Sequence, residues 1–232
     1  MTLAIAHRGD PLVNVENTLV SFRSAVASGA NMVEIDCRVT ADGHAVVLHD
    51  PNLSRLWGVD KEVNRFDWHD LQQISVDGCQ IPDLDEVLRE IAVPIMVDLP
   101  EPNAVEAVLS EIERQATWGR CLFAGEVESL RLVRNLAPGA RIALTWKETS
   151  PPTAQLLDEL RIEFFNPNWT LANRSVIETM HSLGHSVSVW TVDREAEMTM
   201  LIDMDVDALI TNRIGALVKV LQDASSWGAK PE

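Results

Sequence analysis

Short apolar runs rich in β-branched residues alternate along this chain with longer amphipathic runs of about 10–15 residues. Strands that alternate with helices in this way form parallel βα units, so the pattern predicts an α/β protein. Eight such units in 232 residues favour a closed (β/α)8 TIM barrel, with an open doubly wound sheet as the alternative. The expected strands are Leu3–Ala6, Met32–Arg38, Ile95–Asp98, Cys121–Ala124, Ile142–Thr145, Glu163–Phe165, Val187–Thr191 and Ala208–Thr211.

Two of the expected helices carry clear boundary signals. Either Asn17 or Thr18 can cap a helix that has its apolar positions on one face, and Gly29 follows at the place of a C-terminal stop. Asn103 and Glu106 have the spacing of a capping box, so a second helix is expected to begin after Asn103. Both helices fall between expected strands, as a barrel of βα units requires.

The segment from residue 33 to residue 49, which reads VEIDCRVTADGHAVVLH, departs from this alternation. Its turn signal at residues 40–43 lies between two β-rich arms, which predicts a hairpin that extends the second strand above the barrel rim. Antiparallel pairing about that turn would bring His49 close to Glu34 and Asp36.

From Pro51 to about Ile81 the hydrophobic pattern has no clear period, and Asn, Gly, Asp and Trp are scattered through the stretch. A segment of this length inside a compact domain is usually functional or has structure of its own. We therefore expect a small insertion at residues 51–81, after the second barrel strand and over the C-terminal mouth of the barrel. No linker divides the chain, so one domain is expected to span residues 1–232.

The chain is acidic, with 19 Lys and Arg against 35 Asp and Glu and a formal charge of −16. A surface of this sign repels nucleic acid and anionic membranes, so we expect neither as a partner. No stretch approaches the ~18 apolar residues of a membrane span, and the N-terminal segment lacks the features of a signal peptide. A cytoplasmic protein is expected, and any phosphate site in it must be made locally positive.

Acidic side chains mark the C-terminal ends of two expected strands, the face of a barrel that holds active sites. Glu34 and Asp36 alternate with apolar residues, so both carboxylates point to the same side of their strand. Two like charges in one cavity are costly unless a cation neutralises them. Oxygen ligands suit a hard ion, Mg²⁺ or Ca²⁺, and Asp98 ends the next barrel strand where it can be a third ligand.

Two histidines and an arginine complete this set. His7 and His49 would lie on either side of the ion, and two imidazoles can divide the acid and base roles of phosphoryl transfer near neutral pH. The sequence does not decide which of the two acts as the acid. Arg8 can hold a phosphate oxygen with its rigid guanidinium fork.

Six segments of the chain resemble glycerophosphodiester phosphodiesterases: HRG (7–9), ENTLVSF (16–22), GANMVEIDCRVTADGHAVVLHD (29–50), IPDLDEVL (81–88), VSVWTVD (187–193) and VDALITN (206–212). The resemblance is specific up to His49-Asp50 and weak from about residue 100 to residue 180. It implies a barrel with an insertion after the second strand. It also implies hydrolysis of a small glycerophosphodiester to glycerol 3-phosphate and an alcohol, with a divalent cation.

The resemblance also implies roles for single residues. His7 and His49 would be the acid–base pair, and Arg8 would contact the phosphate. Trp190 would pack on the glycerol moiety and Glu16 would support the site. The metal ligands would be Glu34, Asp36 and Asp98.

Three positions depart from the usual pattern of that family. Its third barrel strand usually ends Glu-x-Lys, where this chain has Asp98-Leu99-Pro100 and lacks the phosphate-binding lysine. The usual Ser-Phe after the following strand is replaced by Ala124-Gly125, and the usual Thr-Asp of the last strand by Thr211-Asn212. We hypothesise that Lys147, just beyond the fifth strand, supplies the charge that Pro100 removes.

These departures leave two alternatives to an ordinary glycerophosphodiesterase. One is a relative that acts on a different phosphodiester, such as a lysophospholipid or a sugar phosphodiester. The other is an impaired barrel that binds a phosphodiester without turning it over. The intact pair of His7 and His49 argues against pure binding, which needs no titrating groups at that place.

Overall fold

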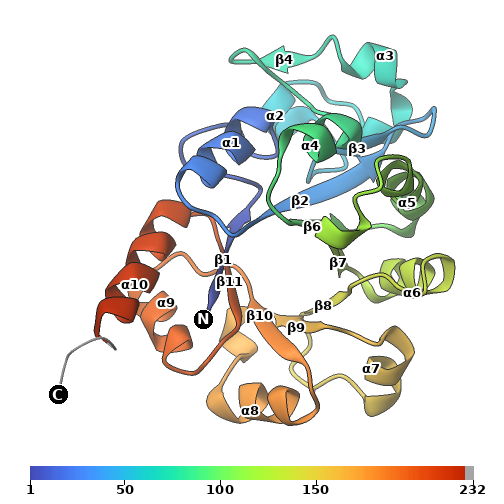
Figure 1. The fold of residues 1–232 in the computed structure, drawn as a ribbon. Helices are drawn as coiled ribbons and strands as arrows, with labels where there is room; N and C mark the ends of the chain where they lie inside the picture. The colour runs from blue at the N-terminus through green and yellow to red at the C-terminus, as the bar shows by residue number, and fades with distance from the viewer. Residues whose placement is uncertain (228–232) are drawn as a thin grey trace.

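The computed structural model describes residues 1–227, which form a nearly closed barrel of parallel strands (Figure 1). A parallel bridge between Phe123 and Ile142 joins the two ends of the sheet. The predicted TIM barrel is therefore confirmed and the open sheet is excluded. In order around the sheet, the barrel strands are β7 (Cys121–Gly125), β6 (Ile95–Leu99), β2 (Met32–Val39), β1 (Leu3–His7), β11 (Ala208–Thr211), β10 (Ser186–Val189), β9 (Phe164–Pro167) and β8 (Ala143–Trp146).

Helices surround the strands, and their apolar sides pack against the outward-facing strand residues (Figure 1). They are α1 (Leu19–Ala27), α4 (Leu84–Glu90), α5 (Val105–Arg114), α6 (Val127–Leu136), α7 (Ala154–Leu160), α8 (Arg174–Ser182), α9 (Glu195–Ile202) and α10 (Ile214–Trp227). Short 3-10 turns η2 (Pro102–Ala104), η3 (Trp118–Arg120) and η4 (Trp169–Leu171) lie between elements. In residues 1–227, none of the helices combines the length and the apolar character needed to cross a bilayer.

The two helix starts predicted from caps have different outcomes. Thr18 is the N-cap of α1, and its hydroxyl accepts a hydrogen bond from the backbone N–H of Ser21. The capping box predicted at Asn103 is wrong, because Asn103 already lies inside η2, which begins at Pro102 and continues directly into α5. A capping box does exist before α4, where Asp83 takes the N-cap position.

The barrel interior is apolar at its base and polar at its mouth. Because inward positions recur every second residue along a strand, the residue two places after each floor residue faces the mouth. The floor residues include Ile5, Met32, Met96, Ala143 and Phe164. Two positions further along the same five strands stand His7, Glu34, Asp98, Thr145 and Asn166.

The predicted hairpin is present. β3 (Ala45–Val47) runs antiparallel to the end of β2, with Cys37 opposite Val47 and Val39 opposite Ala45. This pairing turns the chain back toward the barrel, so His49 reaches the same cavity as Glu34.

The insertion expected at residues 51–81 has structure and a small core of its own. It contains α2 (Ser54–Trp57), η1 (Val63–Arg65), α3 (Trp68–Leu71), β4 (Ser75–Val76) and β5 (Cys79–Gln80). Its apolar side chains form a cluster separate from the barrel core, with Leu53, Trp57, Leu71 and Ile81 buried in it. Figure 1 shows this unit beyond α1 and α4, on the β2 side of the barrel.

Candidate active site

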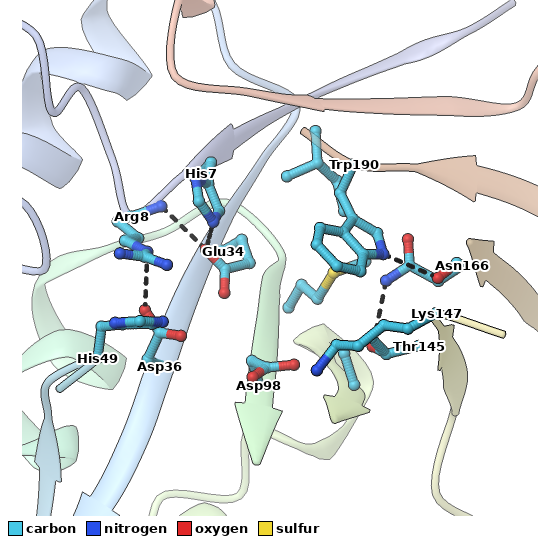
Figure 2. A pocket seen from close by; sticks show the side chains of 13 residues that line it. His7, Arg8, Glu34, Asp36, His49, Asp98, Thr145, Lys147, Asn166 and Trp190 are labelled. Carbon is cyan, nitrogen blue, oxygen red and sulfur yellow. Dashed lines mark hydrogen bonds and ion pairs between the residues drawn. The ribbon is translucent and has the colours of Figure 1, made fainter. Parts of the chain in front are cut away.

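A cavity of about 130 Å³ opens at the C-terminal mouth of the barrel (Figure 2). Of the nine residues singled out from the sequence, eight line this cavity, and Glu16 lies behind it in contact with Arg8. The structure thus brings together side chains from β1, β2, β6 and the end of the hairpin with side chains from β8, β9 and β11. The complete lining is His7, Arg8, Glu34, Asp36, His49, Met96, Asp98, Ala124, Thr145, Lys147, Asn166, Trp190 and Ile210.

The turn after β1 fixes Arg8 against the acidic strand. Arg8 has a left-handed φ of 56°, and its backbone N–H donates to Glu34 Oε2 at 2.9 Å. Gly9 follows with φ 88°, and a Cβ there would lie 2.7 Å from the backbone carbon of Ser21. Only glycine fits that approach, which accounts for the His-Arg-Gly sequence at the end of the strand.

Glu34 and Asp36 are buried and Asp98 is half-buried, and their negative charges are destabilised in these surroundings. Glu34 and Asp36 are 5% and 3% exposed. Burial, followed by the charges of Asp36 and Asp98, raises the pKa of Glu34 well above its usual range. Burial and the charge of Asp36 raise the pKa of Asp98 to about 7. The cavity therefore favours binding of a cation or a proton at these carboxylates.

Protein partners compensate this negative charge only in part. Asp36 Oδ2 accepts a hydrogen bond from Asn17 Nδ2 at 2.8 Å and lies 3.2 Å from Arg8 Nε. That Nε atom is buried and has no hydrogen-bond partner. In the part of the chain that the structure describes, Asp98 has no hydrogen bond or ion pair through its carboxylate, although Lys147 lowers its pKa at a distance.

These carboxylates fit a hard divalent cation by their chemistry, because oxygen ligands are what Mg²⁺ and Ca²⁺ prefer. Among residues 1–227, no three His, Cys, Asp or Glu side chains are grouped as a metal-ligand set. The ligand roles expected of Glu34, Asp36 and Asp98 therefore stay a prediction.

His7 is held by an amide. Its Nδ1 lies 2.8 Å from Asn212 Oδ1, while Asn212 donates its Nδ2 and backbone N–H to Asp193. Because the amide nitrogen is used by Asp193, Asn212 presents its oxygen, and His7 must donate from Nδ1. The lone pair of neutral His7 is then on Nε2, which lies 4.0 Å from Glu34 Oε2. Burial, followed by the charge of Arg8, lowers the pKa of His7 and favours this neutral form.

His49 is held by a carboxylate. Its Nδ1 donates to Asp50 Oδ1 at 2.7 Å, and its side chain is 42% exposed. Hydrogen bonds from Arg55 and His49 outweigh burial and lower the pKa of Asp50, so this carboxylate is charged. His49 thus has a charged carboxylate on Nδ1, where His7 has a neutral amide.

Arg55 in α2 is a site residue that the sequence did not reveal. Its Nη2 lies 2.6 Å from Glu16 Oε1, and its Nε pairs with Asp50. Glu16 in turn accepts from Arg8 Nη1 at 2.9 Å. The insertion thus ties Arg8 and His49 together through two carboxylates, a link that depends on how residues 51–81 fold and has no signal in the local pattern.

The departure at residue 125 and the replacement lysine hypothesised at residue 147 have distinct settings. Gly125 has φ 131°, and a Cβ there would lie 2.3 Å from the carbonyl oxygen of Leu99, so the usual phenylalanine does not fit this backbone. Lys147 lines the cavity, but its Nζ pairs with Glu126 Oε1 at 2.6 Å. The side chains of Lys147 and Glu126 are 58% and 55% exposed, which makes this ion pair weak.

Comparison with known proteins gives a consistent result. Residues 7–216 match the model of the glycerophosphoryl diester phosphodiesterase family. The probable glycerophosphodiester phosphodiesterase 2 of Mycobacterium tuberculosis is 29% identical, with 97% of this chain and 92% of that protein covered. The glycerophosphodiester phosphodiesterase of Caldanaerobacter subterraneus is 26% identical, with 95% and 98% covered. An Oleispira antarctica phosphodiesterase, solved with its product sn-glycerol 3-phosphate, has a TM-score of 0.86 at 22% identity, with 94% and 96% covered.

Proposed function

Since this chain belongs to the glycerophosphoryl diester phosphodiesterase family, we propose that it hydrolyses a small glycerophosphodiester to sn-glycerol 3-phosphate and an alcohol. The observation that carries the proposal is the contrast between the two imidazoles at the cavity. His7 has a neutral amide on Nδ1 and a lowered pKa, whereas His49 has a charged carboxylate on Nδ1. Two imidazoles held by partners of different charge are suited to different roles in acid–base catalysis.

His7 is the general base in this proposal. Its unprotonated Nε2 takes the proton of the attacking hydroxyl, which belongs to a water or to the substrate's own glycerol. The attacking oxygen forms the new bond to phosphorus as its proton moves to His7. Burial at the barrel mouth keeps the ring neutral and available for this step.

His49 is the general acid. As the bond between phosphorus and the alcohol oxygen breaks, the protonated ring gives its Nε2 proton to that oxygen, and the alcohol leaves. Asp50 remains on Nδ1 throughout and orients the ring for the transfer. If the glycerol hydroxyl attacks first, water opens the resulting cyclic diester with the two histidines in exchanged roles.

Glu34, Asp36 and Asp98 would hold Mg²⁺ or Ca²⁺, which supplies polarisation of the phosphoryl oxygens when it is bound. Arg8 binds a phosphate oxygen through the guanidinium that Glu16 already orients at Nη1. The indole of Trp190 packs on the glycerol carbons. Lys147 adds positive charge across the cavity from Arg8.

The test is metal-dependent release of glycerol 3-phosphate from glycerophosphocholine. Activity is expected to disappear with EDTA and to return with added Mg²⁺ or Ca²⁺. A parallel panel with a lysophospholipid and a sugar phosphodiester separates the proposed substrate from the alternatives, and glycerophosphocholine is expected to have the highest kcat/KM. Binding without turnover of every phosphodiester in the panel would reject the proposal in favour of an impaired barrel.

A further inference from the structure

Three uncharged side chains form a hydrogen-bonded row across β8, β9 and β10. Ser188 Oγ donates to Asn166 Oδ1 at 2.8 Å, and Asn166 Nδ2 donates to Thr145 Oγ1 at 3.3 Å. Thr145 and Asn166 stand opposite each other in the parallel register of β8 and β9. Asn166 and Ser188 are buried, so the protein around them fixes the positions of their side chains.

The hydroxyl of Thr145 ends this row at the cavity. Its oxygen accepts a hydrogen bond from Asn166 Nδ2 and another from the backbone N–H of Gly125 at 3.2 Å. These two bonds occupy both acceptor positions of the hydroxyl oxygen, so Thr145 can act only as a donor to a further group. Within residues 1–227 its O–H proton has no acceptor, and Thr145 lines the cavity.

The indole N–H of Trp190, which lies on the same side of the cavity as Thr145, is not available to donate a hydrogen bond to a ligand. Its Nε1–H donates to the backbone oxygen of Asn166 at 3.0 Å. The indole therefore presents only carbon atoms to the cavity (Figure 2). Recognition of a ligand hydroxyl on this side falls to Thr145 and to the second N–H of Asn166.

We infer that the Thr145 hydroxyl, oriented by Asn166 and Ser188, is a specificity-determining donor that binds a hydroxyl oxygen of a polyol phosphate. The inference rests on the proposed function and extends it. Trp190 covers the carbons of the polyol, and Thr145 distinguishes a hydroxylated chain from a plain alkyl chain. A donor that the bound ligand covers but leaves without an acceptor penalises the ligand that lacks the oxygen, which makes such a site selective.

The experiment compares two ligands of equal carbon length, sn-glycerol 3-phosphate and n-propyl phosphate, by calorimetry in the presence of Mg²⁺. The wild-type protein is expected to bind the glycerol ligand about tenfold more tightly. Thr145→Val is expected to remove most of this preference by lowering the affinity for sn-glycerol 3-phosphate alone. Thr145→Ser, which restores the hydroxyl, is expected to restore the preference.

Two further variants separate a binding role from a structural one. Ser188→Ala, which frees the Asn166 amide, is expected to reduce the preference by about threefold, since the donor is then less well oriented. Thr199→Val, the same substitution on the exposed side of α9, is expected to leave both affinities unchanged. The inference would be overturned if Thr145→Val lowered the affinity for both ligands equally, or if it left the preference for sn-glycerol 3-phosphate unchanged.

The kinetic arm keeps this inference distinct from the proposed function. Hydrolysis of glycerophosphocholine is measured for the same proteins. If the wild-type protein hydrolyses it but Thr145→Val leaves the preference for sn-glycerol 3-phosphate over n-propyl phosphate unchanged, the inference is rejected and the proposed function stands. If the wild-type protein does not hydrolyse glycerophosphocholine, the proposed function is rejected and the inference falls with it.

Discussion

The two sides of the cavity differ in charge and in origin. The ionic wall, made of His7, Arg8, Glu34, Asp36, His49 and Asp98, comes from β1, β2, β6 and the hairpin. The neutral wall, made of Thr145, Asn166 and Trp190, comes from β8, β9 and the end of β10. Figure 2 shows the two facing each other. The groups able to move protons and hold a cation thus lie on one side of the cavity, and the groups that can only bind the substrate lie on the other.

The walls also differ in how their side chains are supported. Two groups of the ionic wall have charged or amide partners from outside the cavity: Asn212 holds His7, and Asp50, itself paired with Arg55, holds His49. The neutral wall is supported by one row of hydrogen bonds between neighbouring strands. Loss of a charge should therefore impair turnover, whereas loss of a neutral group should impair binding.

The largest effect is expected from the imidazole on β1. His7→Ala should lower kcat by about 10²–10⁴-fold, because it removes the imidazole proposed to take the proton of the attacking hydroxyl. Asn166→Ala, on the neutral wall, should instead act mainly on KM. Steady-state kinetics on glycerophosphocholine checks both, and a larger loss of kcat in Asn166→Ala than in His7→Ala would break the comparison.

The next effect concerns the carboxylate without a partner. Asp98→Asn should stabilise the metal-free protein by on the order of 1 kcal/mol, because it removes one of three crowded negative charges. The same change should abolish the rise in thermal midpoint that Mg²⁺ or Ca²⁺ gives the wild-type protein. Thermal unfolding with EDTA and with added metal measures both; an undiminished metal-induced shift would mean that Asp98 is not a ligand.

A smaller effect is expected from the insertion. Arg55→Ala should lower kcat about tenfold, because Glu16 and Asp50 lose the cation that fixes them beside Arg8 and His49. Arg65→Ala is the matched control, since this arginine lies in the same insertion but is largely exposed, with only Glu62 at 4.0 Å. Similar rates in the two variants would show that Arg55 has no positioning role.

The smallest effect is expected at the rim of the neutral wall. Lys147→Ala should raise KM for glycerophosphocholine about threefold, because its exposed ion pair with Glu126 limits what its charge contributes. Lys219→Ala, an exposed lysine on α10, controls for the change in net charge. An unchanged KM in Lys147→Ala would reject the hypothesis that this lysine replaces the one missing at Pro100.

The ionic wall could be predicted from the sequence and the neutral wall could not. Period-two alternation around Glu34 and the hairpin before His49 are strong local signals, and charged residues at strand ends are conspicuous. Thr145 and Asn166 resemble ordinary strand residues, and their pairing is evident only once β8 and β9 are neighbours. Arg55 lies in a stretch without periodicity, so its contacts follow from the fold of the insertion alone.

The central claim is that His7 is the base and His49 the acid, and a change of leaving group tests it most directly. A glycerophosphodiester of p-nitrophenol releases its alcohol without needing a proton. His49→Ala is expected to regain near wild-type turnover on this substrate while remaining impaired on glycerophosphocholine. His7→Ala is expected to stay impaired on both. Rescue of His7→Ala but not of His49→Ala would contradict the assignment.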